Sequence, residues 1–306
     1  MALITGCGQG LEKVSKSSEM SSAPAKATPN TTPNSAKDSL SSGKPVSDRS
    51  ANPKGSVFIL EYHHLGISKD TMFRSPDQFK GDLERLYKMG FRPETVNDYL
   101  KGSTELAKGA SPAVFTFDDS NPDQVKLNPD GSLASDCFLG IWQDFTKTHP
   151  DFPIRATFFV LPDTMWGQRK MLSAKLDLLR KLGCELANHT MTHPVLRKLT
   201  DEKAEYEIGE AEMRLEKLGV AAPASLALPF GVSPHNKGIL SGFDYQGKHI
   251  APKAVFLVGA NPAPPVSSPK FNGLRVPRIQ ACEGPFGITY WLDQVDSNKV
   301  KLFVAG

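Results

Sequence analysis

Acidic residues and histidines cluster directly after apolar runs of strand length. Asp118 and Asp119 follow the run at 113–117, and His189 and His193 follow a second run. Histidines at positions i and i+4 lie on one face of a helical turn and can bind the same metal ion. One aspartate with two histidines leaves a coordination position for water, which is the composition of a catalytic zinc site. These residues therefore favour metal-dependent hydrolysis over a closed structural metal site.

A third cluster, residues 61–64 (EYHH), follows the apolar run at 57–60. Adjacent histidines point in different directions, so we expect at most one of the two to face a shared site. If Asp119 binds the metal, Asp118 is free to act as a base and the third histidine as an acid. Each cluster alone has an ordinary explanation, such as a solvated turn or a loop histidine. Only their combination points to a site.

The elements that position these clusters alternate between strands and helices. Apolar runs predict buried strands, which we place at 57–60, 113–117, 156–160, 184–187, 225–228 and 254–258. Helical spacing and end signals predict helices, which we place around 79–87 and over 167–182 and 201–218. Such alternation predicts a mainly parallel sheet, open or closed into a barrel. The carboxyl ends of parallel strands are where sites form in such folds.

Composition and charge narrow the class of protein. The chain has 306 residues, of which 39% are hydrophobic and 23% charged, as in ordinary globular proteins. The net charge of +3 comes from residues 1–54, so the rest of the chain is neutral and nucleic acid is not expected as a partner. The four cysteines form no CxxC pair, which leaves their pairing open and favours buried free thiols.

The N-terminal part differs from the rest. Residues 13–54 are rich in Ser, Pro, Thr, Ala and Lys, which is typical of a flexible, disordered linker. Ahead of it, residues 4–7 (ITGC) resemble a bacterial lipobox, in which Cys7 would receive the lipid. Only six residues precede Cys7 and none is basic, so either the start lies upstream or the match arises by chance. We expect a tether over 1–54, a catalytic domain over 55–306, and an exported lipoprotein of the cell envelope.

Two segments carry a family resemblance. Residues 116–119 (TFDD) and 189–193 (HTMTH) closely resemble the metal motifs of the polysaccharide deacetylase family, the NodB homology domain of carbohydrate esterase family 4. Residues 156–160 (ATFFV) and the flanks of the second motif also match, and the resemblance spans about 57–290. It implies an α/β fold, an irregular (β/α) barrel of the polysaccharide deacetylase type.

The resemblance also implies roles for individual residues. Asp118 corresponds to the general base, and Asp119, His189 and His193 to the metal ligands. The segment 227–231 (ALPFG) corresponds to the family's Arg-x-Pro-Tyr-Gly loop. There the backbone N–H of Phe230 would donate to the oxyanion, which needs no tyrosine side chain.

The chain departs from the family pattern at several places. Ala227 stands where the loop arginine is usual, and neither an Asp-x-x-Asp-Trp nor a Leu-Leu-His-Asp motif occurs. However, the first strand resembles that of a rearranged branch, which includes exported poly-N-acetylglucosamine deacetylases and takes its acid histidine from this strand. His63 is therefore the expected acid, with His64 as the fallback. Arg275 or Arg278 could replace the missing cation beside the base, although ordinary surface positions are the expectation for both.

The resemblance implies a metal-dependent hydrolase that removes N-acetyl groups from N-acetylglucosamine units of peptidoglycan or poly-N-acetylglucosamine. Zinc is the expected metal, and cobalt, nickel or manganese would also suit these ligands. The alternatives are an O-acetyl esterase of xylan-like polymers, a small-molecule amidase, and a non-catalytic carbohydrate-binding protein on the same fold. The polar segment 120–136 could shape a sugar groove or be an inert loop. Trp142 and Trp166 are expected in the core rather than against sugar. The sequence does not indicate an oligomeric state.

Overall fold

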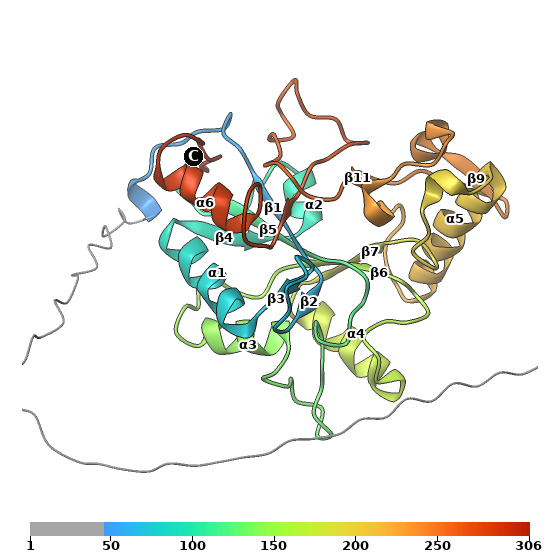
Figure 1. The fold of residues 1–306 in the computed structure, drawn as a ribbon, viewed down its shortest axis with the longest axis horizontal. Coiled ribbons are helices and arrows are strands. Elements are labelled where there is room, and N and C mark those ends of the chain that lie inside the picture. The colour runs from blue at the N-terminus through green and yellow to red at the C-terminus, as the bar shows by residue number, and fades with distance from the viewer. Residues whose placement is uncertain (1–45) are drawn as a thin grey trace, which may run out of the picture. The chain divides into compact units, whose positions relative to one another are not determined.

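A computed structural model of the chain describes residues 46–306. The lipobox-like segment around Cys7 and most of the predicted linker lie outside these residues. The described strands form one eight-stranded parallel sheet and two small ribbons (Figure 1). The large sheet has the order β11 (Val255–Phe256), β8 (Leu226–Ala227), β7 (Glu185–Asn188), β6 (Thr157–Val160), β5 (Ser111–Phe117), β1 (Phe58–Tyr62) and β12 (Ile279–Gln280), and β4 (Phe91–Glu94) also pairs with β5.

Helices connect and cover the strands. The α-helices are α1 (Pro76–Lys88), α2 (Val96–Leu100), α3 (Phe138–Thr146), α4 (Leu172–Lys181), α5 (Asp201–Lys217) and α6 (Ile288–Asp296). The 3-10 helices are η1 (Val46–Asp48), η2 (Arg169–Met171), η3 (Leu196–Lys198), η4 (Pro229–Gly231) and η5 (Lys237–Ser241). The small ribbons are β2 (His64–Leu65) with β3 (Phe73–Arg74), parallel, and β9 (Phe243–Tyr245) with β10 (Lys248–Ile250), antiparallel. Helices α1 and α3 pack together beside the sheet, and α5 lies beside β9 (Figure 1).

Local sequence explains where the predicted helices begin. Ser75 and Gln78 form a capping box at the start of α1, and the Thr200 side chain accepts from the Lys203 N–H at the start of α5. The predicted helix at 167–182 is η2 followed by α4, and the strand predicted at 254–258 is only two residues long. These differences concern only where the predicted elements begin and end.

The sheet curls into an irregular barrel because one segment contacts both of its edges. Val276 forms a parallel bridge with Phe256 of β11, and three residues later Ile279 pairs with Leu60 of β1. The segment 276–280 thus connects the two ends of the strand order. The irregular (β/α) barrel predicted from the sequence is confirmed.

Alternation along the strands sorts side chains between two environments. Phe115 and Phe117 of β5 point into an aromatic core that includes residues of α1 and α3. Val114 points the other way, into a cluster that contains residues of β1, β5, β6, β8 and β11 and therefore lies inside the barrel. Thr116 and Asp118 continue the Val114 side. The polar end of β5 therefore lies at the mouth of the barrel.

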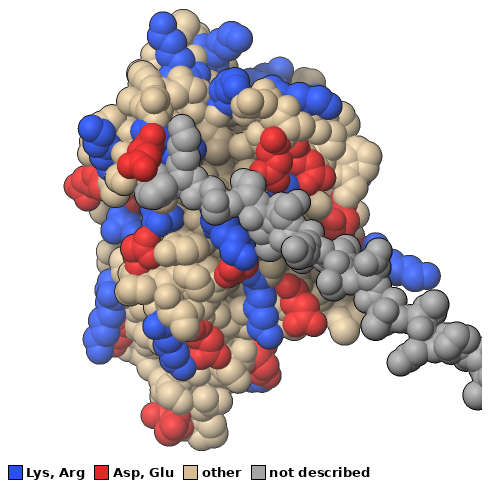
Figure 2. All heavy atoms as spheres, turned by 90° about the vertical axis from the view of Figure 1, so that its left-hand side faces the viewer, with Lys and Arg blue, Asp and Glu red and all other residues tan. Residues whose placement is uncertain are grey.

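The last residues of the predicted linker pack on the barrel. The Arg49 Nη2 donates to Ser111 Oγ at 2.8 Å, and Asn52 N–H donates to the Val304 carbonyl at 2.9 Å. No helix within residues 46–306 combines the length and apolar character needed to cross a bilayer. On the face shown in Figure 2, acidic and basic side chains are interspersed.

Candidate metal and catalytic site

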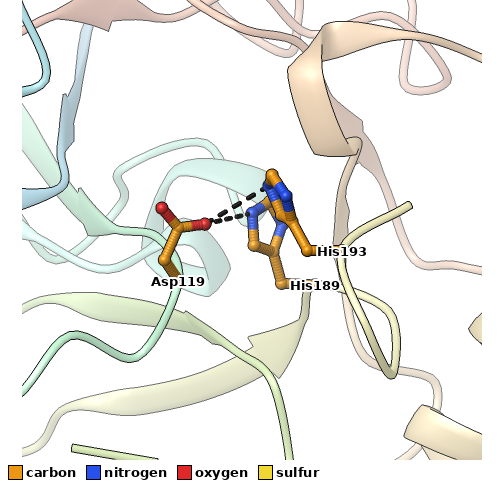
Figure 3. A group of neighbouring side chains, drawn as sticks. All are labelled: Asp119, His189 and His193. Atoms are coloured by element: carbon orange, nitrogen blue, oxygen red, sulfur yellow. Dashed lines mark ion pairs between the residues drawn. The ribbon is translucent and has the colours of Figure 1, made fainter. Parts of the chain in front are cut away.

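The structure brings the three predicted metal ligands together at the carboxyl ends of two strands. Asp119 follows β5, and His189 and His193 follow β7. The Nε2 atoms of His189 and His193 lie 3.2 and 3.3 Å from Asp119 Oδ1, so both rings converge on one carboxylate oxygen (Figure 3). One ligand atom from each residue lies within 4.8 Å of the other two.

The chemical state of these atoms fits a divalent metal. His189 Nε2 and Asp119 Oδ1 are buried and have no hydrogen-bond partner. The other ring nitrogen of His189, Nδ1, is 2.9 Å from the Ala227 carbonyl and donates to it, which leaves a lone pair on Nε2. Burial alone would raise the pKa of Asp119, but the adjacent His189 side chain outweighs this effect and lowers that pKa. Unpartnered buried polar atoms are costly, and a bound cation would satisfy both.

The backbone around the ligands is strained. Asp119, Ser120, Thr190 and His193 all have a left-handed φ, between 58° and 71°. This conformation costs free energy in residues other than glycine, and such strain concentrates at functional sites. The strained turn at 190–193 is held by side chains: Thr190 N–H donates to Asn188 Oδ1 at 2.8 Å and His193 N–H to Thr190 Oγ1 at 3.1 Å.

Glu207 of α5 supports the same turn. Its Oε2 accepts from the N–H groups of Met191 and Thr192 at 3.0 and 2.8 Å, and its Oε1 accepts from Thr192 Oγ1 at 2.7 Å. Glu207 is buried although α5 is a charged helix. Sequence reasoning missed this residue, because one glutamate among several on a helix carries no signal of its burial.

Asp118 is bound by Arg278. Nη1 and Nη2 of the guanidinium lie 2.7 Å from Oδ1 and Oδ2 of the carboxylate, respectively, in a bidentate ion pair. Arg278 is fully buried and also donates to Thr116 Oγ1 at 3.0 Å and to the Leu257 carbonyl at 2.8 Å. Burial would raise the pKa of Asp118, but the Arg278 charge outweighs it and holds that pKa well below its usual range. Of the two arginines considered, Arg278 is the one beside Asp118, whereas Arg275 is exposed.

His63 lies between two carboxylates. The register of β1 with β5 ends at Tyr62 opposite Phe117, which places His63 beside Asp118. Its Nε2 is 3.6 Å from Glu61 Oε1 and 4.0 Å from Asp118 Oδ2. His64 instead lies 3.3 Å from Asp123 through Nδ1 and stacks on Phe73, with ring centroids 4.6 Å apart. The two histidines thus point apart as expected.

Glu61 is a buried acid whose part in the site the sequence did not reveal. Its Oε2 accepts from the Gly259 N–H at 2.7 Å and lies 3.5 Å from Arg278 Nε, while its Oε1 has no hydrogen-bond partner. Burial raises the pKa of Glu61 despite the nearby Arg278 charge. Glu61, His63 and Asp118 are close enough to hold a metal. However, the Arg278 guanidinium already serves both carboxylates, so a second cation would be repelled there.

Phe230 lies beside the metal group. It has φ 56° in η4, the residue is 58% exposed, and the centroid of its ring is 4.6 Å from that of His193. The segment 227–231 therefore touches both histidines, through the Ala227 carbonyl and through this ring.

The segment 120–136 contributes a buried side chain that supports the backbone of the candidate site. Gln124 is buried, and its Nε2 donates to the carbonyls of His63 and Asp118 at 2.9 and 2.5 Å. Trp166 Nε1 donates to Gln124 Oε1 at 3.2 Å. Trp142 and Trp166 are both fully buried, which confirms the prediction that they pack in the core.

Comparisons with known proteins agree with this geometry. Residues 107–244, which include Asp118, Asp119 and both histidine ligands, match a family model described as polysaccharide deacetylase. Among solved structures, the deacetylase PplD of Streptococcus pyogenes, in complex with acetate, is 19% identical over 75% of this chain and 93% of that chain, with a TM-score of 0.53. BC0361, a polysaccharide deacetylase from Bacillus cereus, is 17% identical over 80% and 69%, with a TM-score of 0.56. A search of curated proteins found no match. At these identities the structural likeness shows a shared fold.

Proposed function

We propose, because residues 107–244 match the polysaccharide deacetylase family model, that the protein hydrolyses N-acetyl groups of N-acetylglucosamine units in a cell-envelope or exported polysaccharide, peptidoglycan or poly-N-acetylglucosamine. One observation carries the proposal. Asp118, paired with Arg278, places Oδ2 only 3.8 Å from His189 Nε2, next to the candidate metal group. An ionised base beside a metal site is an arrangement that supports metal-dependent hydrolysis of an amide.

Asp119, His189 and His193 would hold the metal. A divalent ion at this position supplies Lewis acidity toward water and toward an acetyl carbonyl. We propose zinc, and the same nitrogen and oxygen ligands would accept cobalt, nickel or manganese.

The chain's own groups then have distinct roles. Asp118 accepts the proton of the attacking water, and Arg278 keeps its carboxylate charged and oriented. The backbone N–H of Phe230 donates to the acetyl oxygen as negative charge develops there. His63 donates a proton to the departing amine nitrogen, so that water and the amide become acetate and a free amino sugar.

Arg278 also bears on the non-catalytic alternative. A binding protein on a former enzyme fold has two supports: Ala227 stands where the family has an arginine, and the Leu-Leu-His-Asp motif is absent. Arg278 supplies a cation to Asp118 from another strand end, so this substitution does not leave the base unpaired. The proposed substrate is an exported polymer, and a cell-envelope location with lipid at Cys7 is the matching proposal for localisation.

The test is mass spectrometry of N-acetylglucosamine oligomers incubated with the zinc-loaded protein, beside Asp118→Asn as a control. Stepwise loss of acetyl groups with the parent alone supports the proposal. If acetylated xylan loses acetyl groups and these oligomers do not, the protein is an O-acetyl esterase. If a tightly bound metal is present and no acetylated glycan reacts, the binding-protein alternative replaces the proposal.

A further inference from the structure

Three aromatic side chains form a cluster around the start of α6. The ring centroids of Phe286, Tyr290 and Trp291 are 5.1 to 6.3 Å apart, so each ring contacts the other two. Phe286 is 53% exposed, and Tyr290 and Trp291 are half-buried. We call these three residues the aromatic platform. The mechanism proposed above does not use it.

The platform lies at the same end of the barrel as the metal group. It follows the carboxyl end of β12, which runs parallel to β1 with Glu61 opposite Gln280. Trp291 Nε1 donates to the Ala260 carbonyl at 3.0 Å, and the Ala260 N–H donates to the Arg278 carbonyl at 2.8 Å. Two hydrogen bonds therefore connect the platform to the arginine that holds Asp118.

Exposed apolar side chains concentrate on this end of the barrel. Within residues 46–306, the large hydrophobic side chains that are exposed are Ile67, Tyr206, Phe230 and Phe286. Ile67 lies just after β2, which continues from β1, and Phe230 and Phe286 lie on segments that follow the carboxyl ends of β8 and β12. Exposed apolar surface that gathers beside a site indicates a binding surface.

The charges around the platform favour a neutral ligand. Residues 281–298 contain three acidic residues and no Lys or Arg. Glu283 pairs with Arg74 at 2.5 Å, and Asp293 pairs with Arg85 at 2.6 Å. An anionic lipid surface would be recognised by unpaired basic residues. A pyranose ring is uncharged on its faces and presents C–H groups that pack on aromatic rings.

We propose that the aromatic platform is a sugar subsite, which stacks on a pyranose ring of the same polysaccharide beyond the ring whose acetyl group is removed. The inference rests on the proposed function and extends it, because it makes the protein prefer oligomers over short acetylated sugars. Stacking on the platform would also place the polysaccharide across the mouth of the barrel, where His63 and Asp118 lie.

Binding can be measured without turnover through the fluorescence of Trp291. The chain has three tryptophans, and Trp142 and Trp166 are fully buried, so Trp291 alone can touch a ligand at the surface. We expect N-acetylglucosamine hexamer to change the tryptophan emission of the parent and not that of Trp291→Phe. Phe286→Ala should weaken hexamer binding about fivefold to tenfold, as loss of one stacked ring would. Tyr206→Ala on α5 is the matched control, because Tyr206 is similarly exposed and its ring neighbours Tyr245 of β9 rather than the platform.

Chain-length dependence gives a second readout. Phe286→Ala should raise KM for the hexamer about fivefold to tenfold and leave kcat/KM for the dimer within about twofold of the parent. Equal binding and equal length dependence in the parent and Phe286→Ala would overturn the subsite even if deacetylation is observed. Conversely, a Phe286-dependent fluorescence response without any turnover would support the subsite and count against the proposed reaction.

A lipid surface is the alternative ligand of the aromatic platform, and the fluorescence of Trp291 tests this alternative as well. If phosphatidylcholine vesicles, with or without phosphatidylglycerol, change Trp291 emission and the hexamer does not, the platform binds membrane and the sugar subsite is wrong.

Discussion

Arg278 and Asp118, which are 160 residues apart in the chain, form a buried two-pronged ion pair with both N–O distances at 2.7 Å. The pair forms because the segment 276–280 closes the barrel between β11 and β1 and carries the guanidinium into its mouth. It follows that Asp118 is ionised and held in one orientation before any substrate binds. In this chain the closing segment supplies the cation, in place of the loop at Ala227.

Replacing Arg278 is expected to change the pH dependence of activity. Without the guanidinium, burial raises the pKa of Asp118, so the acid limb of the activity–pH profile should move to higher pH. Arg278→Lys keeps a charge but loses the two-pronged contact, so we expect a smaller shift and a loss of about tenfold or more in kcat. Arg278→Met leaves buried carboxylates unpaired at a cost of about 3–5 kcal/mol in stability, and its folding should be checked by thermal unfolding.

Arg275→Ala is the control for these variants, because Arg275 is exposed and close in sequence. Its profile should match that of the parent. An unchanged acid limb in folded Arg278→Met would show that Arg278 does not tune the base.

The two neighbouring histidines should differ sharply in their effect on turnover. His63→Gln removes the proton donor next to Asp118, and kcat should fall about 100-fold or more. His64→Gln removes a contact with Asp123 and the stacking on Phe73, and kcat should stay within about threefold. Steady-state deacetylation of an oligomer measures both. A larger loss with His64→Gln would reverse the assignment.

Base and ligand variants should separate turnover from metal content. Asp118→Asn should keep the metal, because Asp118 is not one of the converging ligands, and lose about 100-fold or more in turnover. His193→Ala removes one of three ligands and should lose the metal. Metal per chain after dialysis, measured by mass spectrometry, distinguishes the two. Equal metal loss in both variants would mean that the roles are wrongly assigned.

Glu207 should affect the metal site without contacting the metal. Glu207→Gln disrupts the contacts that hold the turn at 191–192, and metal affinity should fall about tenfold to 100-fold. Competition with a chelator measures the affinity, and addition of excess zinc should restore turnover. Glu202→Gln, exposed in the first turn of the same helix, serves as the control. If Glu207→Gln binds metal with the affinity of the parent, the contacts from α5 hold the turn but do not affect the metal site.

The sequence predicted the parts of the site that are local in the chain. Asp118, Asp119 and the two histidine ligands each follow a buried strand, and parallel strands bring their carboxyl ends to one edge. It did not settle contacts that depend on closure of the barrel, such as the choice between Arg275 and Arg278. The sequence also does not show which polar residues are buried, and Glu61 looks like any polar residue near a strand end. The helix α3 was also missed, because its first five residues are all buried and carry no alternating polar face.

Glu94 should make stability depend on pH independently of the metal. It is buried at the end of β4 and accepts from Ser103 Oγ at 2.5 Å. Burial raises the pKa of Glu94 from 4.5 to about 7, although the Ser103 hydrogen bond opposes the shift. Between these two values the folded protein holds a proton that the unfolded chain releases, so stability falls as pH rises, by about 3 kcal/mol in total.

Glu94→Gln should remove this loss, since the amide resembles the protonated acid and does not ionise. Its Tm should match that of the parent near pH 4.5 and exceed it by about 5 °C or more at pH 8, because the parent then buries a charge. Glu202→Gln, in an exposed position at the start of α5, should leave Tm unchanged at both pH values. A difference of the same size at both pH values would show that Glu94 is not protonated in the folded protein, and that the substitution acts only through packing.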